Sequence, residues 1–389
     1  MELSTTFPLS VQASLLHARC AVSTIFFVNG MVLASWVPHI PTVKAYHAIS
    51  DSQLGIVLLF MAGGSLLALP VAGGFISRFG SRTMTTGAAL SFCLMLPLPI
   101  LSPNVPTLAL SLMLLGACNS LLDVSMNAQA VDVERQYQRP IMSSFHGLFS
   151  LGGLVGAALA SQAMALGASD RQHVILITIL AVAVVTGMLP WLLSSPPRLR
   201  EQGPTFVRPS GVLLSLGILA FFGLLAEGAM ADWSAVYLHD VLKSAPATAA
   251  LGFAACSMMM AVGRFSGDFL ALHFGPAQLL RFSSLLAAFG LGSGLLIGTP
   301  FAAIIGFGFV GLGIANIIPV LFSAAGKIQG IHSGNALAAV ATTGYFGFLA
   351  GPPLIGFAAE VTNLSLALGL VSIFCVFIAA RASIVLPAK

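Results

Sequence analysis

The feature that most constrains this chain is a succession of apolar runs, each long enough to cross a lipid bilayer as a helix. Such a helix needs about 20 predominantly apolar residues. Clusters of Pro, Gly and charged residues separate twelve runs, near residues 17–38, 52–76, 83–102, 106–130, 141–165, 173–194, 211–238, 248–271, 277–298, 301–325, 334–359 and 363–385. Only 7% of the residues are charged, against about 25% in soluble domains. The sequence therefore predicts an all-α polytopic membrane protein with twelve transmembrane helices.

The longest polar break lies near the middle of the chain and is rich in Pro and Arg. It predicts an N-terminal six-helix bundle over residues 1–194, a cytoplasmic linker over 195–210 and a C-terminal six-helix bundle over 211–389.

Short motifs of the first half recur about 197 positions later. The matches are Asn29-Gly30 with Glu227-Gly228, Trp36 with Trp233, Leu54-Gly55 with Leu251-Gly252, Gly80 with Gly275, Gly116 and Asn119 with Gly313 and Asn316, and Gly147 with Gly344. A duplicated six-helix unit is the plan of transporters whose two halves enclose a site at mid-membrane depth.

Lys and Arg are distributed unevenly between the two sides of such a path. If the N-terminus is cytoplasmic, only Lys44, Arg171 and Lys243 fall outside, and Arg264 lies within a helix. The others all fall inside: Arg19, Arg78, Arg82, Arg135, Arg139, Arg198, Arg200, Arg208, Arg281, Lys327, Arg381 and Lys389. Because cytoplasmic loops carry the excess of Lys and Arg, we expect both termini in the cytoplasm. The basic residues are scattered rather than clustered, so no nucleic-acid partner is expected.

A polar stripe crosses the fourth apolar run. Asn119, Asp123 and Asn127 follow one another at i, i+4 spacing, which places them on one helix face. A carboxylate at bilayer depth costs roughly 2.5–3.5 kcal/mol on insertion scales, and such groups usually mark substrate or proton pathways. The alternative is a structural carboxylate satisfied by neighbouring helices.

The chain resembles the major facilitator superfamily over its whole length. The family's basic loop signature after the second helix matches GGFISRFGSR over residues 73–82, with Ser77 in place of the usual acid, and GRFSGDFLALHFG over 263–275 is a second partial copy. Arg264 and Asp268, at i, i+4 spacing, are interpreted together with Arg78 as structural charges or gate contacts.

Within that superfamily the chain is most similar to the fucose-permease-like group of sugar or drug permeases. The matching phrases are WVPHIP over 36–41, DVSMNAQ over 123–129, SFHG over 144–147 and EGAMADW over 227–233. The resemblance implies a proton-linked role for Asp123. The group's carboxylate on the first helix is missing here, where residues 35–38 read SWVP.

Three further titratable residues are candidates for substrate binding or proton coupling. Glu227 could supply the acid that the first helix lacks, or could bond a neighbouring helix. Asp232 lies farther along the same run and is either a site residue or a residue of the outer mouth. An imidazole ordinarily titrates near physiological pH, so His146 could assist Asp123 or merely anchor its helix.

Amide and aromatic side chains complete the candidate set. Amides suit hydroxyl-rich ligands, but they also join helices at about 0.6 kcal/mol each; the candidates are Asn29, Asn119, Asn127 and Asn316. Trp36 and Trp233 are read as interfacial belt anchors or as an aromatic wall beside the substrate, and Tyr345 is a weaker candidate of that second kind.

We therefore expect a secondary active transporter of a small organic solute, sugar-like by preference and proton-coupled. The alternatives are an exporter of drugs or metabolites, or a non-transporting membrane sensor. No enzyme motif, metal site or cofactor is predicted, and the proton gradient is the expected driving force. The expected setting is a bacterial inner membrane, with the chain working as a monomer.

Overall fold

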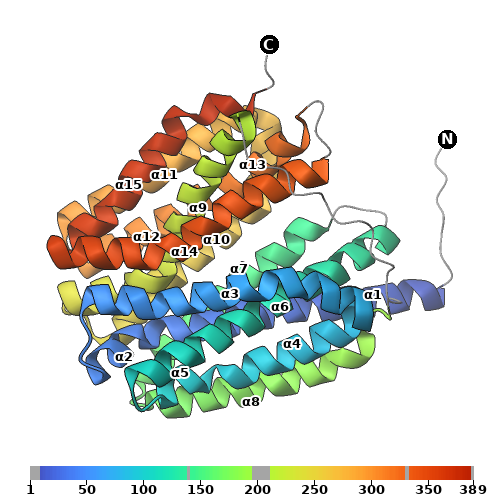
Figure 1. Ribbon diagram of the computed structural model, residues 1–389, viewed down its shortest axis with the longest axis horizontal. Coiled ribbons are helices and arrows are strands. Elements are labelled where there is room, and N and C mark those ends of the chain that lie inside the picture. The colour runs from blue at the N-terminus through green and yellow to red at the C-terminus, as the bar shows by residue number, and fades with distance from the viewer. Residues whose placement is uncertain (1–8, 138–140, 195–210, 329–332, 387–389) are drawn as a thin grey trace.

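The computed structural model describes residues 9–137, 141–194, 211–328 and 333–386, and those residues form helices and turns without a strand. The order is α1 (Leu9–Trp36), η1 (Val37–His39), α2 (Ile40–Tyr46), α3 (Asp51–Phe79), α4 (Ser81–Met95), α5 (Pro97–Leu101), α6 (Val105–Tyr137), α7 (Met142–Ala165), α8 (Asp170–Met188), η2 (Leu189–Trp191), α9 (Gly211–Val236), η3 (Tyr237–Val241), α10 (Pro246–Phe274), α11 (Pro276–Ile297), α12 (Pro300–Ile314), α13 (Ile317–Gly326), α14 (Ser333–Val361), α15 (Leu364–Ala380) and η4 (Ala382–Val385). Figure 1 shows α1 to α8 in one group and α9 to α15 in another beside it.

The helices provide the predicted membrane spans. Among the described residues, ten helical segments are long and apolar enough to cross a membrane. Apolar α15 has 17 residues and α14 has 29, and these two complete the twelve. The fold class predicted from the sequence is therefore confirmed. The predicted 195–210 linker lies outside the described residues.

Equivalent helices pair in the same way in the two groups. The α1–α7, α3–α6 and α1–α8 pairs of the first group correspond to the α9–α14, α10–α12 and α9–α15 pairs of the second. The turn after α3 and the turn after α10 use glycines with φ of 80° and 75°, Gly80 and Gly275, in the left-handed region that glycine enters without steric cost. These repeated features give the chain its pseudo-two-fold symmetry.

Proline sets the ends of several helices. The first span was predicted to end near residue 38, but after Trp36 it continues through η1 and α2 to Tyr46, with a proline near the start of each of these short helices. Proline lacks a backbone N–H and fits best in the first turn of a helix, so each proline starts a new short helix rather than ending the span. The end of the molecule that carries η1, α2 and η3 is called the Lys44 end below.

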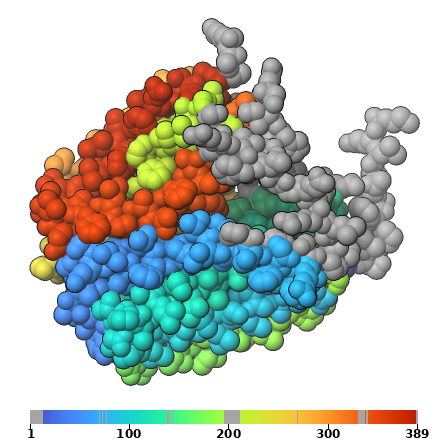
Figure 2. Space-filling model, viewed as in Figure 1, coloured from blue at the N-terminus to red at the C-terminus, as the bar shows by residue number. Residues whose placement is uncertain are grey.

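Two helix pairs make the main contact between the groups. They are α7 with α10 and α3 with α14, and α2 adds contacts with α9 at the Lys44 end. The space-filling view shows the orange-red surface of the second group seated on the blue surface of α3 (Figure 2). Figure 1 shows the ribbons close together at the α2 end and farther apart toward the end that carries both termini.

Candidate transport site

An ion pair with a contact across the two groups lies at the centre of the candidate site. The Arg264 Nη2 atom on α10 is 3.4 Å from Glu227 Oε1 on α9. The Arg264 Nη1 atom donates a hydrogen bond of 2.9 Å to the Ser150 hydroxyl on α7. One guanidinium therefore joins two helices of its own half to a helix of the other half, which its planar array of donors allows.

Asp123 lies on α6 beside its predicted neighbour Asn127. The Asn127 Nδ2 atom donates to the Asp123 backbone oxygen at 2.8 Å and to the Asp123 carboxylate at 3.1 Å. Among the residues that the structure describes, no Lys, Arg or His forms an ion pair with Asp123. The i, i+4 contact expected from the sequence is present. In the described part of the chain, an amide and no cation contacts the carboxylate.

Tyr345 on α14 lies near both acids. Its phenol lies within range of the charges of both Asp123 and Glu227, and 40% of its surface is exposed. We call these side chains the central polar cluster: Asp123, Asn127, His146, Ser150, Glu227, Arg264 and Tyr345.

The cluster lies deep within the helices. At 1.5 Å per residue, Asp123 is about 27 Å from the start of α6 and Glu227 about 24 Å from the start of α9. Both remain partly exposed. Because a carboxylate is costly against hydrocarbon, partial exposure at this depth suits a surface between the two helix groups.

His146 packs against an aromatic ring at the edge of the cluster. Its ring packs edge-on against Phe26 with centroids 5.3 Å apart, and it lies within electrostatic range of Arg264. Among the described residues no hydrogen bond joins it to Asp123. The imidazole therefore borders the Arg264 side of the cluster.

Three of the four candidate asparagines occupy packed surroundings. Asn316 is buried and donates to the Gly263 backbone oxygen at 3.0 Å. Asn29 is also buried, and its Nδ2 atom lies 3.5 Å from the Met126 sulfur. The Asn119 Oδ1 atom is buried without a hydrogen-bond partner in the described part of the chain. For Asn316 the structure supports the helix-joining alternative, because its amide donates a hydrogen bond to a backbone carbonyl of α10.

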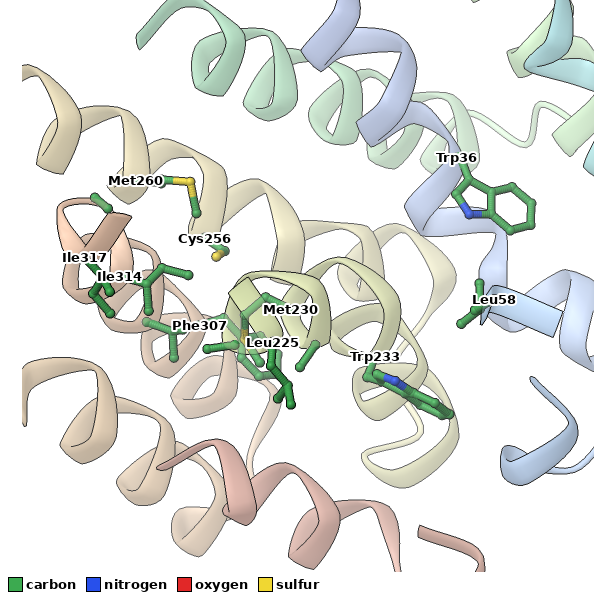
Figure 3. Close-up of a cluster of buried hydrophobic side chains, with 14 of the residues drawn as sticks. Trp36, Leu58, Leu225, Met230, Trp233, Cys256, Met260, Phe307, Ile314 and Ile317 are labelled. Carbon is green, nitrogen blue, oxygen red and sulfur yellow. The ribbon is translucent and has the colours of Figure 1, made fainter. Parts of the chain in front are cut away.

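The belt interpretation of the two tryptophans is wrong. Trp36 and Trp233 are only 2% and 0% exposed, whereas a belt residue needs its ring at the membrane surface. Figure 3 shows the two indoles on helices of different halves, with Leu58 near Trp36. The two buried indoles therefore occupy equivalent positions of the repeat, near the ends of α1 and α9. Their positions in the sequence do not show whether the rings are buried or exposed.

For the remaining predicted residues, the structure describes no contact with the cluster. Asp232 is partly exposed, and no hydrogen bond or ion pair joins it to another described side chain. Arg78 is exposed in the last turn of α3, with its guanidinium 5.3 Å from the ring centroid of Phe79. The side chain of Asp268 lies outside the described residues, so its predicted pair with Arg264 remains a prediction.

Sequence reasoning missed a second polar group, at the Lys44 end. The Lys44 ammonium is 2.6 Å from Asp51 Oδ1 on α3 and 2.6 Å from Asp240 Oδ2 in η3. A sequence signal was available, because Lys44 and Asp240 are 196 positions apart, which matches the spacing of the repeat.

A histidine pair holds η1 against α8 at the same end. The His39 Nδ1 atom is 2.9 Å from Asp170 Oδ1, and its Nε2 atom is 2.8 Å from His173 Nδ1. His39 is fully buried. The partners are 131 and 134 positions away along the chain, so no local pattern indicates this contact.

A protein-family model matches most of the chain. The model that matches residues 22–352 is described as the Major Facilitator Superfamily. The chain belongs to this family. An uncharacterised MFS-type transporter of Yersinia pestis is 39% identical over 359 residues, which cover 92% of this chain and 93% of the relative. The membrane protein MosC of Rhizobium meliloti is 36% identical, with coverage of 90% and 85%.

Solved structures share the fold. The nucleoside transporter NupG, as a point variant, superposes with a TM-score of 0.75 and 11% identity, covering 95% of this chain and 99% of its own. A D-xylose–proton symporter gives a TM-score of 0.74 and 13% identity, with coverage of 94% and 97%. The chain is thus a multi-pass membrane transporter rather than an enzyme, as its sequence predicts.

Proposed function

We propose that this transporter couples the movement of a small, hydroxyl-rich solute to the movement of a proton through Asp123. The observation that carries the proposal is the difference between the two acids of the central polar cluster. Glu227 is paired with Arg264, whereas the side-chain partner of Asp123 among the described residues is the amide of Asn127.

The charge balance explains how a proton would act here. A paired carboxylate is compensated, but an unpaired one deep in the molecule is costly unless it is hydrated or neutralised. A proton on Asp123 removes that charge when the halves close around it. Because linkage is reciprocal, a solute that favours the protonated form also raises the affinity for the proton.

The groups around Asp123 favour an uncharged, hydroxyl-rich solute. Asn127 and Tyr345, and Ser150 across the cluster, offer both donors and acceptors, and Arg264 is already engaged by Glu227 and Ser150. Two neighbours in fold are named as transporters of a nucleoside and of D-xylose, which is consistent with a sugar-like solute. All members of the cluster come from one chain, so we propose that the monomer is sufficient.

The test uses the full chain in proteoliposomes that are screened with sugars, aromatic acids and cationic drugs. The signal is solute-induced alkalinisation outside the vesicles, measured for the wild type and Asp123→Asn. We expect Asp123→Asn to lose the pH signal and accumulation driven by a pH gradient, but to retain counterflow, because exchange of solute for solute needs no net proton movement.

Gradient-driven accumulation by Asp123→Asn at the wild-type level would overturn the proposed proton site. Loading the solute inside or outside separates uptake from export, the alternative direction. Absence of flux with every solute class would instead support the non-transporting sensor.

A further inference from the structure

The Lys44 end carries a short chain of ionic contacts between the two halves. Lys44, in the last turn of α2, contacts Asp51 of its own half and Asp240 of the other, both at 2.6 Å. The second carboxylate oxygen of Asp240 is 2.7 Å from His239 Nδ1. The side chains of Lys44, Asp51 and Asp240 are 16%, 23% and 30% exposed, so water reaches the group only in part.

Lys44 and Asp240 occupy near-equivalent positions of the internal repeat. Their separation is 196 residues, one less than the 197 that separates Trp36 from Trp233 and Leu54 from Leu251. The turns that follow are also alike, because Ala48 and Lys243 have φ of 51° and 53°. These are the non-glycine residues with positive φ in the described part of the chain.

Contact between near-equivalent positions shows that the pair lies close to the pseudo-two-fold axis. A two-fold rotation places equivalent points on opposite sides of its axis at equal distances, so points that touch lie next to the axis. In transporters built from parallel repeats, this axis runs along the membrane normal and passes between the halves. The Lys44–Asp240 pair therefore lies over the path between the halves, rather than at its rim.

Two buried indoles precede this pair along the chain. Trp36 and Trp233, which are equivalent positions of the repeat, come eight and seven residues before Lys44 and Asp240. Another contact between the halves flanks the group, where the Ser52 backbone N–H donates to Glu360 of α14 at 3.3 Å.

We propose that Lys44 and Asp240 form the gate that closes the Lys44 end during transport, with Asp51 as a holding partner for Lys44. When the halves separate at this end, the Lys44–Asp240 contact breaks because its members move with different halves. Asp51 moves with Lys44 and keeps the ammonium paired, so the gate opens without leaving the lysine uncompensated. The proposal rests on the transporter fold and is independent of the proton and the solute.

The test measures how fast a cysteine in the central polar cluster reacts with a membrane-impermeant maleimide added from the Lys44 side. The reporter is Tyr345→Cys in a chain whose native cysteines are replaced by alanine: Cys20, Cys93, Cys118, Cys256 and Cys375. We compare Lys44→Asp, Asp240→Lys and the double variant that carries both changes. Lys243→Asp is the matched control, because Lys243 follows Asp240 by three residues, is exposed and lies outside the ionic group.

Each single charge reversal places like charges on opposite sides of the pseudo-two-fold axis, and their repulsion should separate the two halves at the Lys44 end. We expect each single change to raise the labelling rate about five-fold, the effect of losing a partly exposed ion pair worth roughly 1 kcal/mol. The double variant restores one lysine between two acids and should return the rate to within about two-fold of the reporter chain. Lys243→Asp should label at the reporter's own rate.

Unchanged labelling in both single variants, or no recovery in the double variant, would overturn the gate. If the charge-reversed chains fail to fold, Lys44→Gln and a salt series on the unaltered reporter replace them. Salt of about 1 M shortens the screening length to about 3 Å and should accelerate labelling of the reporter. A labelling rate that changes neither with Lys44→Gln nor with salt would equally reject the proposal. Because no solute or pH gradient is used, failure here is distinct from failure of Asp123 as the proton site.

Discussion

At the scale of single residues, Arg264 shows what a linear sequence conveys and what it hides. Its charge within an apolar run marks it from the sequence, and i, i+4 spacing nominates Asp268 as its partner. The observed contacts with Glu227 and Ser150 depend on how α9, α10 and α7 are rotated against one another. Such rotations are set by packing along the whole helix length, so no local pattern reveals them.

Lysine should not replace Arg264. An ammonium can approach Glu227 as a point charge, but it lacks the planar fork that also reaches Ser150. We expect Arg264→Lys to lower the initial counterflow rate about ten-fold. Ser150→Ala should lower it less, and the double variant should be no worse than Arg264→Lys alone, because the two changes remove one shared contact.

Additive losses in this cycle would show that the hydrogen bond between Arg264 and Ser150 does not contribute to transport. Initial rates in proteoliposomes at equal protein content provide the measurement.

At the scale of elements, the sequence predicts spans well and their contacts poorly. Apolar runs bounded by Pro, Gly and charge are local features, so the helices were expected where most of them lie. The continuation of the first span through η1 and α2 was not, because Pro38 and Pro41 look like a stop when only the local sequence is read. The buried state of Trp36 was also inaccessible, because it depends on how α1 packs against other helices, as with Leu58 of α3 (Figure 3).

The crossing of α3 and α14 illustrates such a dependence and can be tested. A Cβ atom at Gly55 would lie 2.6 Å from the Pro352 backbone oxygen, and one at Gly356 would lie 2.6 Å from the Asp51 backbone oxygen. Backbone atoms cannot give way easily, so Gly55→Val should force the two helices apart at a cost of about 1–3 kcal/mol. We expect a lower unfolding temperature in detergent.

Gly63→Ala on the same helix is the control, since a Cβ atom there meets nothing within 4 Å. It should leave the unfolding temperature unchanged or raise it, because alanine favours a helix more than glycine does. A loss as large as that of Gly55→Val would mean that α3 is sensitive to any added side chain.

At the scale of the whole molecule, the transporter family and the internal repeat could be recognised from sequence, because both are distributed over many positions. The candidate site could be predicted only in part. The sequence nominates Asp123 and Asn127 together on one helix face and Glu227 and Tyr345 separately, but their mutual arrangement depends on the relative placement of the two halves. The finer assignment to the fucose-permease-like group and the division at 195–210 stay predictions.

Orientation is a property of the whole chain and can be measured directly. From the distribution of Lys and Arg we expect both termini in the cytoplasm and the Lys44 end outside. A fluorescent protein fused after Lys389 should fold and fluoresce, whereas alkaline phosphatase at the same site should be inactive. Phosphatase inserted in the turn after Tyr46 should be active. The reverse pattern would place the Lys44 end in the cytoplasm.

The opposite charges of Lys44 and Asp240 also bear on which surfaces can meet at the pseudo-two-fold axis. Two identical six-helix units meeting about a two-fold axis place the same residue on both sides of it, as tryptophan is placed at positions 36 and 233. At the Lys44–Asp240 contact, the first half contributes an ammonium and the second half a carboxylate. The contact therefore selects a first half against a second half, because two first halves would bring two lysines together near the axis.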